Sequence, residues 1–242
     1  MLKGGSNAGK AGIYFAGTAP RLFVEGCTIV SNYYGVYGGS FGTPNTVTFR
    51  NVLIARNTSH GAFFDCTSWV GGHYCYLYHC TVADNGGDGV HFERDYRMDV
   101  VPVAKNSIFA GNGGFGIYKE STTGGGSIQN CLFHGNARGE SYSYYVVTLA
   151  DLGSNKSGRD PKFVAPAALD YRVASDSPAA GAGMNLTGTP YFVTTDMRNV
   201  ARPLGDAWDM GAYEGDGAGE GALPGVSYVR TTGSDVTGDG SA

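Results

Sequence analysis

The stretch CTVADNGGDGVHF, residues 80–92, decides the fold because variants of it recur along the chain. It joins two short apolar runs through four Gly or Asn residues, a composition that disfavours a helix. Related phrases are CTIVSNYYGVYG from Cys27, VLIARNTSHGAFF from Val52, SIFAGNGGFGIY from Ser107 and CLFHGNARGESY from Cys131, with a shorter copy, SNAGKAGIYF, from Ser6. Such self-similarity at a steady spacing predicts a solenoid.

The repeats align on one asparagine. These asparagines are Asn7, Asn32, Asn57, Asn85, Asn112 and Asn136, separated by 25, 25, 28, 27 and 24 residues. Within each repeat the apolar residues lie two positions apart, which is the period of a strand with one buried face. The abundant Gly, Asn, Thr, Tyr and β-branched residues favour strands and turns. We therefore predict an all-β fold, a parallel β-helix of about six coils over residues 1–150.

The asparagine column has a structural explanation. Asn adopts the left-handed backbone conformation of a sharp corner more readily than most residues. Amide side chains stacked at the ~4.8 Å spacing of strands can hydrogen-bond from one coil to the next. We expect such a ladder from Asn32, Asn57, Asn85, Asn112 and Asn136. The Gly that follows each asparagine supplies a positive φ or a crowded corner.

The five cysteines fall into two groups. Cys27, Cys80 and Cys131 share one inward-facing column on alternate coils. Alternate coils are roughly 9–10 Å apart, too far for a disulfide, so these three are expected to be small core residues. Cys66 and Cys75 flank an insertion, and the sequence leaves open whether they are bonded.

Composition excludes two classes of partner. The net charge is −4 and no basic patch occurs, which excludes nucleic acid. No run of 18 apolar residues occurs, so we expect no membrane span. The sequence opens inside a repeat and shows no signal peptide at Met1, which leads us to expect a piece of a longer protein.

Two later phrases carry a family resemblance. They are GRDPKFVAPAALDYRVASDSPAAGAG and DMRNVARPLGDAWDMGAYEG, within residues 159–215. They resemble the C-terminal region, often labelled choice-of-anchor, of bacterial right-handed parallel β-helix repeat proteins, which belong to the pectate-lyase-like solenoid superfamily. The resemblance implies a right-handed coil and an extracellular or cell-surface location. We expect residues 151–215 to cap the end of the coil, followed by a Gly-rich linker over 216–225.

The tail, VSYVRTTGSDVTGDGSA at 226–242, resembles the start of another β-helix unit. One explanation is a tandem array of units. Another is polymerisation, in which Tyr228, Val229 and Arg230 add as a strand to the open first coil of a neighbouring copy. A disordered tail is the third. We expect no cofactor, although Asp235 and Asp239 could hold Ca²⁺.

The densest charge in the coils lies in the third-coil loop GDGVHFERDYRMD. It offers Asp88, His91, Glu93, Arg94, Asp95 and Arg97 as candidate catalytic residues. A polysaccharide lyase needs a base beside a sugar acid and a group, often Ca²⁺, that neutralises its carboxylate. The corresponding positions of neighbouring coils hold Phe64, Asp65, Lys119 and Glu120, from which we expect no continued column of carboxylates.

Aromatic residues provide candidate sugar-binding positions. They are Trp69, His73, Tyr76 and Tyr78. Metal-ligand spacings, nucleophile elbows and phosphate loops do not occur. The leading expectation is a non-catalytic extracellular or cell-surface segment, structural or adhesive, that contacts polysaccharide and other copies of itself. The alternative is a lyase acting on acidic glycans.

Overall fold

The computed structural model describes residues 11–16, 21–39, 46–65, 73–93, 100–120, 125–143, 149–188, 190–215 and 228–229. These residues form short strands, β1 to β21, and one 3₁₀ turn, η2 (Pro166–Ala168). Within these ranges no helix has the length and apolar character needed to cross a membrane.

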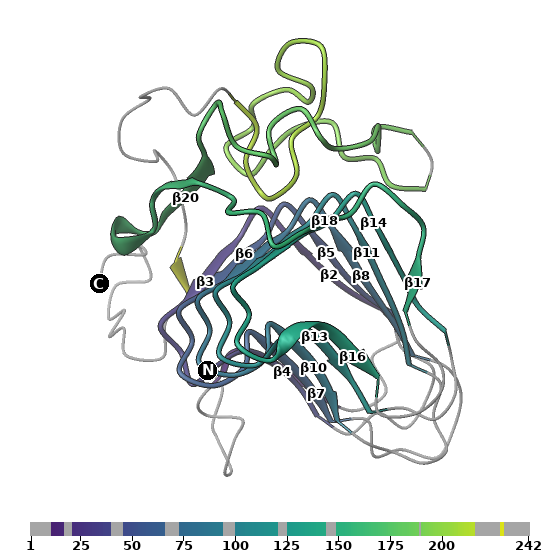
Figure 1. Cartoon of the computed structure of the whole chain (residues 1–242). Coiled ribbons are helices and arrows are strands. Elements are labelled where there is room, and N and C mark those ends of the chain that lie inside the picture. The colour runs from purple at the N-terminus through teal and green to yellow at the C-terminus, as the bar shows by residue number, and fades with distance from the viewer. Residues whose placement is uncertain are drawn as a thin grey trace, which may run out of the picture.

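Parallel strands wind into three sheets, seen nearly end-on in Figure 1. Sheet A contains β1 (Ala11–Phe15), β4 (Tyr34–Gly38), β7 (Ala62–Asp65), β10 (Val90–Glu93), β13 (Phe115–Lys119) and β16 (Gly139–Ser143). Sheet B contains β2 (Arg21–Glu25), β5 (Thr46–Arg50), β8 (His73–Tyr78), β11 (Val100–Lys105), β14 (Ser127–Gln129) and β17 (Ala150–Asp151). Sheet C contains β21 (Tyr228–Val229), β3 (Thr28–Val30), β6 (Leu53–Ala55), β9 (Thr81–Ala83), β12 (Ile108–Ala110), β15 (Leu132–His134) and β18 (Lys156–Ser157). The predicted all-β parallel β-helix is confirmed.

The expected number of coils was too high. Four turns, from β2 to β13, have at least one buried residue in every strand, instead of about six. The next turn ends in β16, whose residues are all exposed or half-buried. The first and last rungs are partial, since β1 precedes the first full turn and only β17 and β18 follow the last. Repeated sequence therefore extends further than the well-packed part of the coil.

The interior of the coil is a continuous apolar column. Inward residues of all three sheets form one cluster, which includes Phe49, Leu77, Phe109 and Phe133, all fully buried. Phe109 and Phe133 stack with their ring centroids 5.0 Å apart. Cys80 and Cys131 are buried in the same cluster. Cys66 lies outside the described residues, so its pairing with Cys75 stays open.

Two corners of each turn have a left-handed backbone, but not at the ladder asparagines. Between sheets B and C the corner residues with positive φ are Gly26, Asn51, His79, Asn106, Asn130 and Gly153. Between sheets C and A they are Ser31, Arg56, Asp84, Gly111 and Gly135, each directly before a ladder asparagine. The expectation that the ladder asparagines adopt this conformation was wrong. The preceding residue makes the bend, which leaves the asparagine side chain pointing inward.

The ladder asparagines hydrogen-bond from turn to turn. Nδ2 of each donates to Oδ1 of the next, and the distances are 3.3 Å from Asn32 to Asn57, 2.9 Å from Asn57 to Asn85, 2.9 Å from Asn85 to Asn112 and 2.8 Å from Asn112 to Asn136. The neighbouring glycines are required by crowding. A Cβ on Gly35 would lie 2.4 Å from the carbonyl oxygen of Gly61, and one on Gly61 would lie 2.5 Å from that of Gly89.

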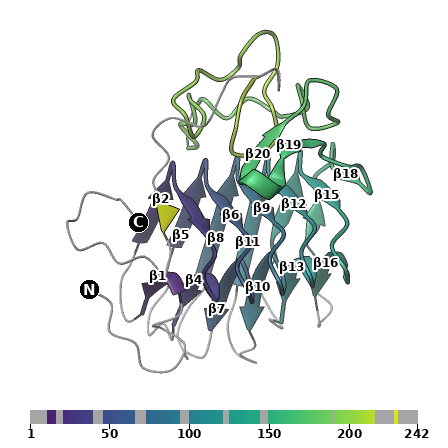
Figure 2. The same ribbon diagram turned by 90° about the vertical axis from the view of Figure 1, so that its left-hand side faces the viewer.

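After β17 and β18, the rest of the C-terminal region, residues 159–215, lies along the side of the coil over sheet C (Figure 2). Outward residues of sheet C, among them Val30, Leu53, Ala83, Ile108 and Leu132, pack against Tyr171, Val173, Ala179, Met210, Ala212 and Tyr213. At the end of the coil, β17 and β18 pair with β14 and β15, whereas the rest of this region lies along the side, where no cover was expected. The reason is that sheet C is apolar on both faces and needs a cover along its length.

The tail strand β21 lies at one edge of sheet C. It pairs in parallel with β3 of its own chain, with Tyr228 opposite Thr28 and Val229 opposite Ile29. It thus occupies the edge of the first turn, the edge that a neighbouring copy would fill in the polymerisation explanation. Arg230, Asp235 and Asp239 lie outside the described residues.

Candidate functional site

The candidate site residues fall on two different sheets. Asp88 lies two residues before β10 of sheet A, and His91 and Glu93 lie on that strand. Tyr76 and Tyr78 lie on the outer face of β8 in sheet B. His73 begins β8, and only its backbone is described. Trp69, Arg94, Asp95 and Arg97 are outside the described residues. Within the described part, the fold does not bring the catalytic and the sugar-binding candidates together.

A groove of about 520 Å³ runs over the outer face of sheet B. Its lining comes from four consecutive strands, β2, β5, β8 and β11, and from the C-terminal region. The aromatic residues in this lining are Phe23, Tyr76, Tyr78 and Tyr191. Phe23 is 55% exposed, so part of the aromatic surface faces solvent.

The groove carries positive charge. Arg21, Arg50 and Lys105 line it, and the part of the lining that the structure describes contains no carboxylate. The Arg50 guanidinium lies 4.2 Å from the centroid of the Phe23 ring and donates a 2.7 Å hydrogen bond to the Tyr191 carbonyl. Lys105 Nζ donates to Gln129 Oε1 at 3.0 Å and lies 5.0 Å from the Tyr191 ring centroid. The nearest acidic group described is Glu25, 3.6 Å from Arg50 Nε.

Tyrosines of β8 are held side by side along the groove. Tyr74 and Tyr76 stack with centroids 6.0 Å apart, and Tyr76 and Tyr78 with centroids 5.7 Å apart. Tyr191 meets the Tyr78 ring edge-on at 5.1 Å. Burial raises the pKa of both Tyr76 and Tyr78 above the ordinary phenol value, and both phenols, protonated at neutral pH in any case, can donate a hydrogen bond.

A second feature is a continuous stack of rings on the outer face of sheet A. Successive strands contribute Tyr14, Tyr37, Phe63, His91, Tyr118 and Tyr142, one ring from each of the six. Centroid separations along the stack run from 4.7 to 5.8 Å. Because each ring covers the faces of its neighbours, this surface presents ring edges, in contrast to the part-exposed Phe23 face of the groove.

Asp88 and His91 meet directly within sheet A. His91 Nδ1 lies 2.7 Å from Asp88 Oδ2, and the Phe115 N–H donates to Asp88 Oδ1 at 2.5 Å. Burial alone would raise the pKa of Asp88, but these hydrogen bonds and the charge of His91 outweigh it and hold that pKa below its usual value. A third group, His60, joins this pair from the preceding turn.

A column of carboxylates does continue along sheet A, contrary to expectation. Glu93 is paired with Asp65 in the sheet register, and the Glu120 N–H donates to the Phe92 carbonyl. Asp65, Glu93 and Glu120 therefore occupy consecutive turns. Burial and then the charges of Asp65 and Glu120 raise the pKa of Glu93, with His91 acting in the opposite direction. Lys119 does not belong to this column. It is buried and lies opposite Phe92 in the register of the sheet.

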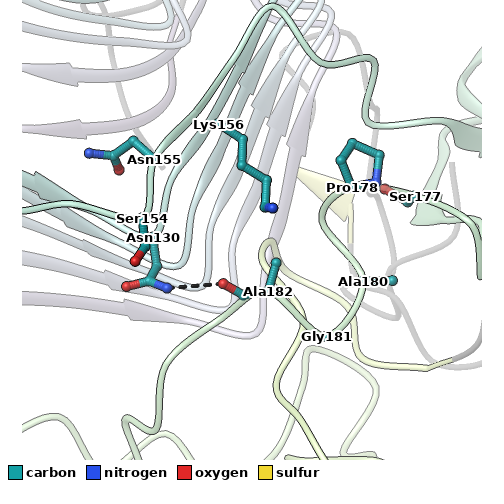
Figure 3. Close-up of a pocket in the computed structure, with 9 residues that line it drawn as sticks. All are labelled: Asn130, Ser154, Asn155, Lys156, Ser177, Pro178, Ala180, Gly181 and Ala182. Atoms are coloured by element: carbon teal, nitrogen blue, oxygen red, sulfur yellow. Dashed lines mark hydrogen bonds between the residues drawn. The ribbon is translucent and has the colours of Figure 1, made fainter.

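A polar pocket of about 530 Å³ marks the contact between the last turns and the C-terminal region (Figure 3). Lys156 of β18 projects toward the segment that carries Pro178 and Ala182, and Asn130 Nδ2 donates to the Ala182 carbonyl at 3.0 Å. Among the described residues that line it, Lys156 alone carries a charge. The pocket is best described as the seam between the two parts.

Several groove and cluster residues were not identified from the sequence. Arg50 and Lys105 stand in one column with Glu25, Tyr78 and Gln129, which the repeat pattern identifies only as an outer face. Tyr191 comes from a region without repeats, so no local signal indicates it. His60 does have a signal, because it stands directly before Gly61 as Asp88 stands directly before Gly89.

Comparison with known proteins identifies the coil. A family model described as a right handed beta helix region matches residues 6–154, more than half of the 242 residues, and takes in all strands from β1 to β17. The search of curated proteins and the search of solved structures returned no match. The choice-of-anchor resemblance of residues 159–215 lies outside the matched range and stays a prediction.

Proposed function

The chain belongs to the family of right-handed β-helix proteins, and from that premise we propose that it is a non-catalytic extracellular or cell-surface unit that binds acidic polysaccharide. The observation that carries this proposal is the groove on sheet B. Three cations line it together with four aromatic rings, in a chain whose net charge is −4. The positive charge is therefore concentrated against the overall charge of the chain.

The residue types suit a sugar acid. An aromatic face can pack against the apolar face of a sugar ring, and the phenols of Tyr76 and Tyr78 can hydrogen-bond its hydroxyl groups. Arg50 and Lys105 can pair with carboxylates, Arg50 with its planar fork and Lys105 as a point charge. Four strands line the groove at the ~4.8 Å spacing of a parallel sheet, so an extended chain could contact several turns at once.

The test is binding of a soluble acidic polysaccharide, polygalacturonate, measured by affinity electrophoresis and calorimetry with dextran as a neutral control. We expect binding to polygalacturonate that weakens with added salt, and none to dextran. Tyr76→Ala and Lys105→Gln should each weaken it about tenfold, the equivalent of ~1.4 kcal/mol. Tyr142→Ala, on the outer face of sheet A, is the matched control and should leave affinity unchanged.

Equally strong binding of polygalacturonate and dextran would contradict the groove as the site. The same affinity for polygalacturonate in Tyr76→Ala, Lys105→Gln and Tyr142→Ala would also contradict it. The same samples test the lyase alternative, since an unsaturated sugar product absorbs in the ultraviolet. Product formation that is lost in Asp88→Asn and retained in Tyr142→Ala would replace the binding proposal by the lyase.

We further propose that two copies can join by exchanging the tail strand. The pairing of β21 with β3 joins the two ends of one chain, and the same pairing formed between chains would link one copy to the next. Such exchange makes no new contact, so a closed monomer and a joined dimer use the same backbone hydrogen bonds.

Light scattering of the chain with and without residues 226–242 tests the exchange. We expect a concentration-dependent dimer or larger species that disappears on truncation, while circular dichroism shows that the coil remains folded. Monomers in both samples would contradict joining through the tail and leave the groove proposal standing.

A further inference from the structure

His60, Asp88 and His91 form a compact cluster on the outer face of sheet A. One potential ligand atom from each lies within 4.8 Å of the other two. Asp88 Oδ2 is 2.7 Å from His91 Nδ1 and 3.5 Å from His60 Nδ1. Asp88 and His91 come from the same turn and His60 from the preceding one, so the cluster joins two turns of the coil.

Asp88 and His91 are held in place before any ligand arrives, whereas His60 Nδ1 must first release the Asp88 N–H that it accepts. Asp88 Oδ1 accepts the Phe115 N–H, which fixes the carboxylate and leaves Oδ2 facing the two imidazoles. The His91 ring is stacked between Phe63 and Tyr118, with centroids 5.1 and 4.7 Å away. The His60 ring stacks on Tyr34, with an interplanar angle of 8°. Aromatic neighbours thus pack against both imidazole rings, as supporting residues do around metal ligands.

The spacing of the atoms suits a small divalent cation. Metal–nitrogen and metal–oxygen bonds of ~2.0–2.2 Å place neighbouring ligand atoms of a tetrahedral site about 3.4 Å apart. The two distances to Asp88 Oδ2, 2.7 and 3.5 Å, lie on either side of that separation. A cation there would replace the proton between His91 and Asp88. Binding to His60 Nδ1 would also displace the Asp88 backbone N–H, which now donates to that atom at 2.9 Å.

We propose that His60, Asp88 and His91 bind one first-row transition-metal ion of the Zn²⁺ class. Two imidazoles and one carboxylate are the ligands that Zn²⁺, Co²⁺ and Ni²⁺ prefer, whereas Ca²⁺ and Mg²⁺ prefer oxygen donors alone. Three protein ligands leave a further coordination position for water or for a group of a bound molecule. The site is separate from the sheet B groove and does not depend on the proposed function.

The test uses the full chain without a polyhistidine tag. Calorimetry with Zn²⁺ and absorption spectra with Co²⁺ should show one equivalent bound, with the visible bands of a nitrogen- and oxygen-ligated Co²⁺. His60→Ala and His91→Ala should each weaken binding at least tenfold, in line with the loss of one ligand. His134→Ala, which alters a histidine of β15 in sheet C, is the matched control and should bind like the parent chain.

Circular dichroism and melting of the metal-free variants separate lost binding from lost folding. Because His60 and His91 are part-exposed on the outer face, we expect both variants to keep the spectrum of the parent chain. If either fails to fold, the paired variants His60→Gln and His91→Gln replace it. Absence of Co²⁺ binding to the parent chain, undiminished binding in folded His60 and His91 variants, or binding of Ca²⁺ in preference to Zn²⁺ would overturn the proposal.

Discussion

In the coil, a buried amide finds its partner one turn away in an identical side chain, as Asn57 does with Asn85. In the C-terminal region, the buried Arg202 is held by an unrepeated set of groups. Its guanidinium contacts the Glu214 carboxylate, the Gly211 carbonyl and, across to the coil, Asn51 Oδ1. The Arg202 and Glu214 side chains are 0% and 1% exposed. The coil thus spreads its polar contacts over many equivalent residues, whereas the region beside it concentrates them in a few.

This difference predicts how strongly the loss of one side chain destabilises each part. Loss of one ladder residue leaves neighbouring turns with their own contacts, because each turn mainly contacts the next. Loss of Arg202 leaves the carboxylates around it buried without their cation. Burial already raises the pKa values of Glu214 and Asp209, against the opposing effect of Arg202. We therefore expect the largest single-residue effects in the C-terminal region.

Arg202→Met should cause the largest loss of stability. Removing one partner of a buried ion pair costs about 3–5 kcal/mol, and here the loss falls on the contact between the region and sheet C. Limited proteolysis should cleave the variant within residues 149–215 while the coil persists, and urea unfolding should become two-step. Lys162→Ala, which removes an ion pair exposed on both sides, is the control and should behave like the parent chain. Unchanged proteolysis of Arg202→Met would contradict the proposed role of the pair.

Asn85→Ala should have the next largest effect. Asn85 donates to the Ile54 carbonyl and to Asn112, and accepts two hydrogen bonds from Asn57, all in the buried interior. Loss of these bonds should cost about 2–3 kcal/mol, since unsatisfied buried groups remain.

Asn136→Ala sharpens this prediction because Asn136 ends the ladder and is only half-buried. Water can reach its partners, so we expect about 1 kcal/mol by urea unfolding. Equal losses at Asn85 and Asn136 would show that burial does not set the strength of the ladder.

Alkaline pH should have a graded effect on the coil, one that accumulates over several pH units. Burial raises the pKa values of Cys80 and Cys131 from 9.0 to about 12. A raised folded-state pKa gives stability that is fully present below the unfolded value and is lost as pH rises through the folded value. Between about pH 9 and 12, each thiol should therefore remove up to ~1.4 kcal/mol per pH unit from the free energy of unfolding.

The double variant Cys80→Ala/Cys131→Ala isolates the thiol contribution from that of other groups that titrate in the same range. Its free energy of unfolding, measured in urea at several pH values, should fall less steeply above pH 9 than that of the parent chain. Parallel curves would mean that the two thiols stay accessible to base in the folded coil.

The sequence predicts the coil well because each turn repeats the same physical problem. Inward residues such as Ile54, Val82 and Phe109 recur in one column, and their alternation with outward residues sets the strands. What the pattern could not provide is the exact corner. Ser31, Arg56 and Asp84 share a positive φ but no chemistry, so no residue type marks the bend.

The sequence of sheet C does indicate where the C-terminal region lies. Strands β3, β6 and β12 of sheet C read TIV, LIA and IFA, with apolar residues on the outward as well as the inward side. A strand that is apolar on both faces indicates a cover over its outer face. The groove was less accessible to prediction, because Tyr191 joins Tyr76 and Tyr78 only through this lateral packing.

The corner residues between sheets B and C have one more consequence. Asn130 holds Ala182, Asn106 holds Met184 and Asn51 holds Thr195, so the chain travels back from the last turn toward the first. The length of the returning segment therefore has to match the number of turns that it crosses. Duplication of one turn in the gene would lengthen the coil by a single step and move the corner asparagines out of reach of their partners in this segment. Growth of this protein by repeat duplication thus requires a matching insertion in residues 182–195, and the two lengths must evolve together.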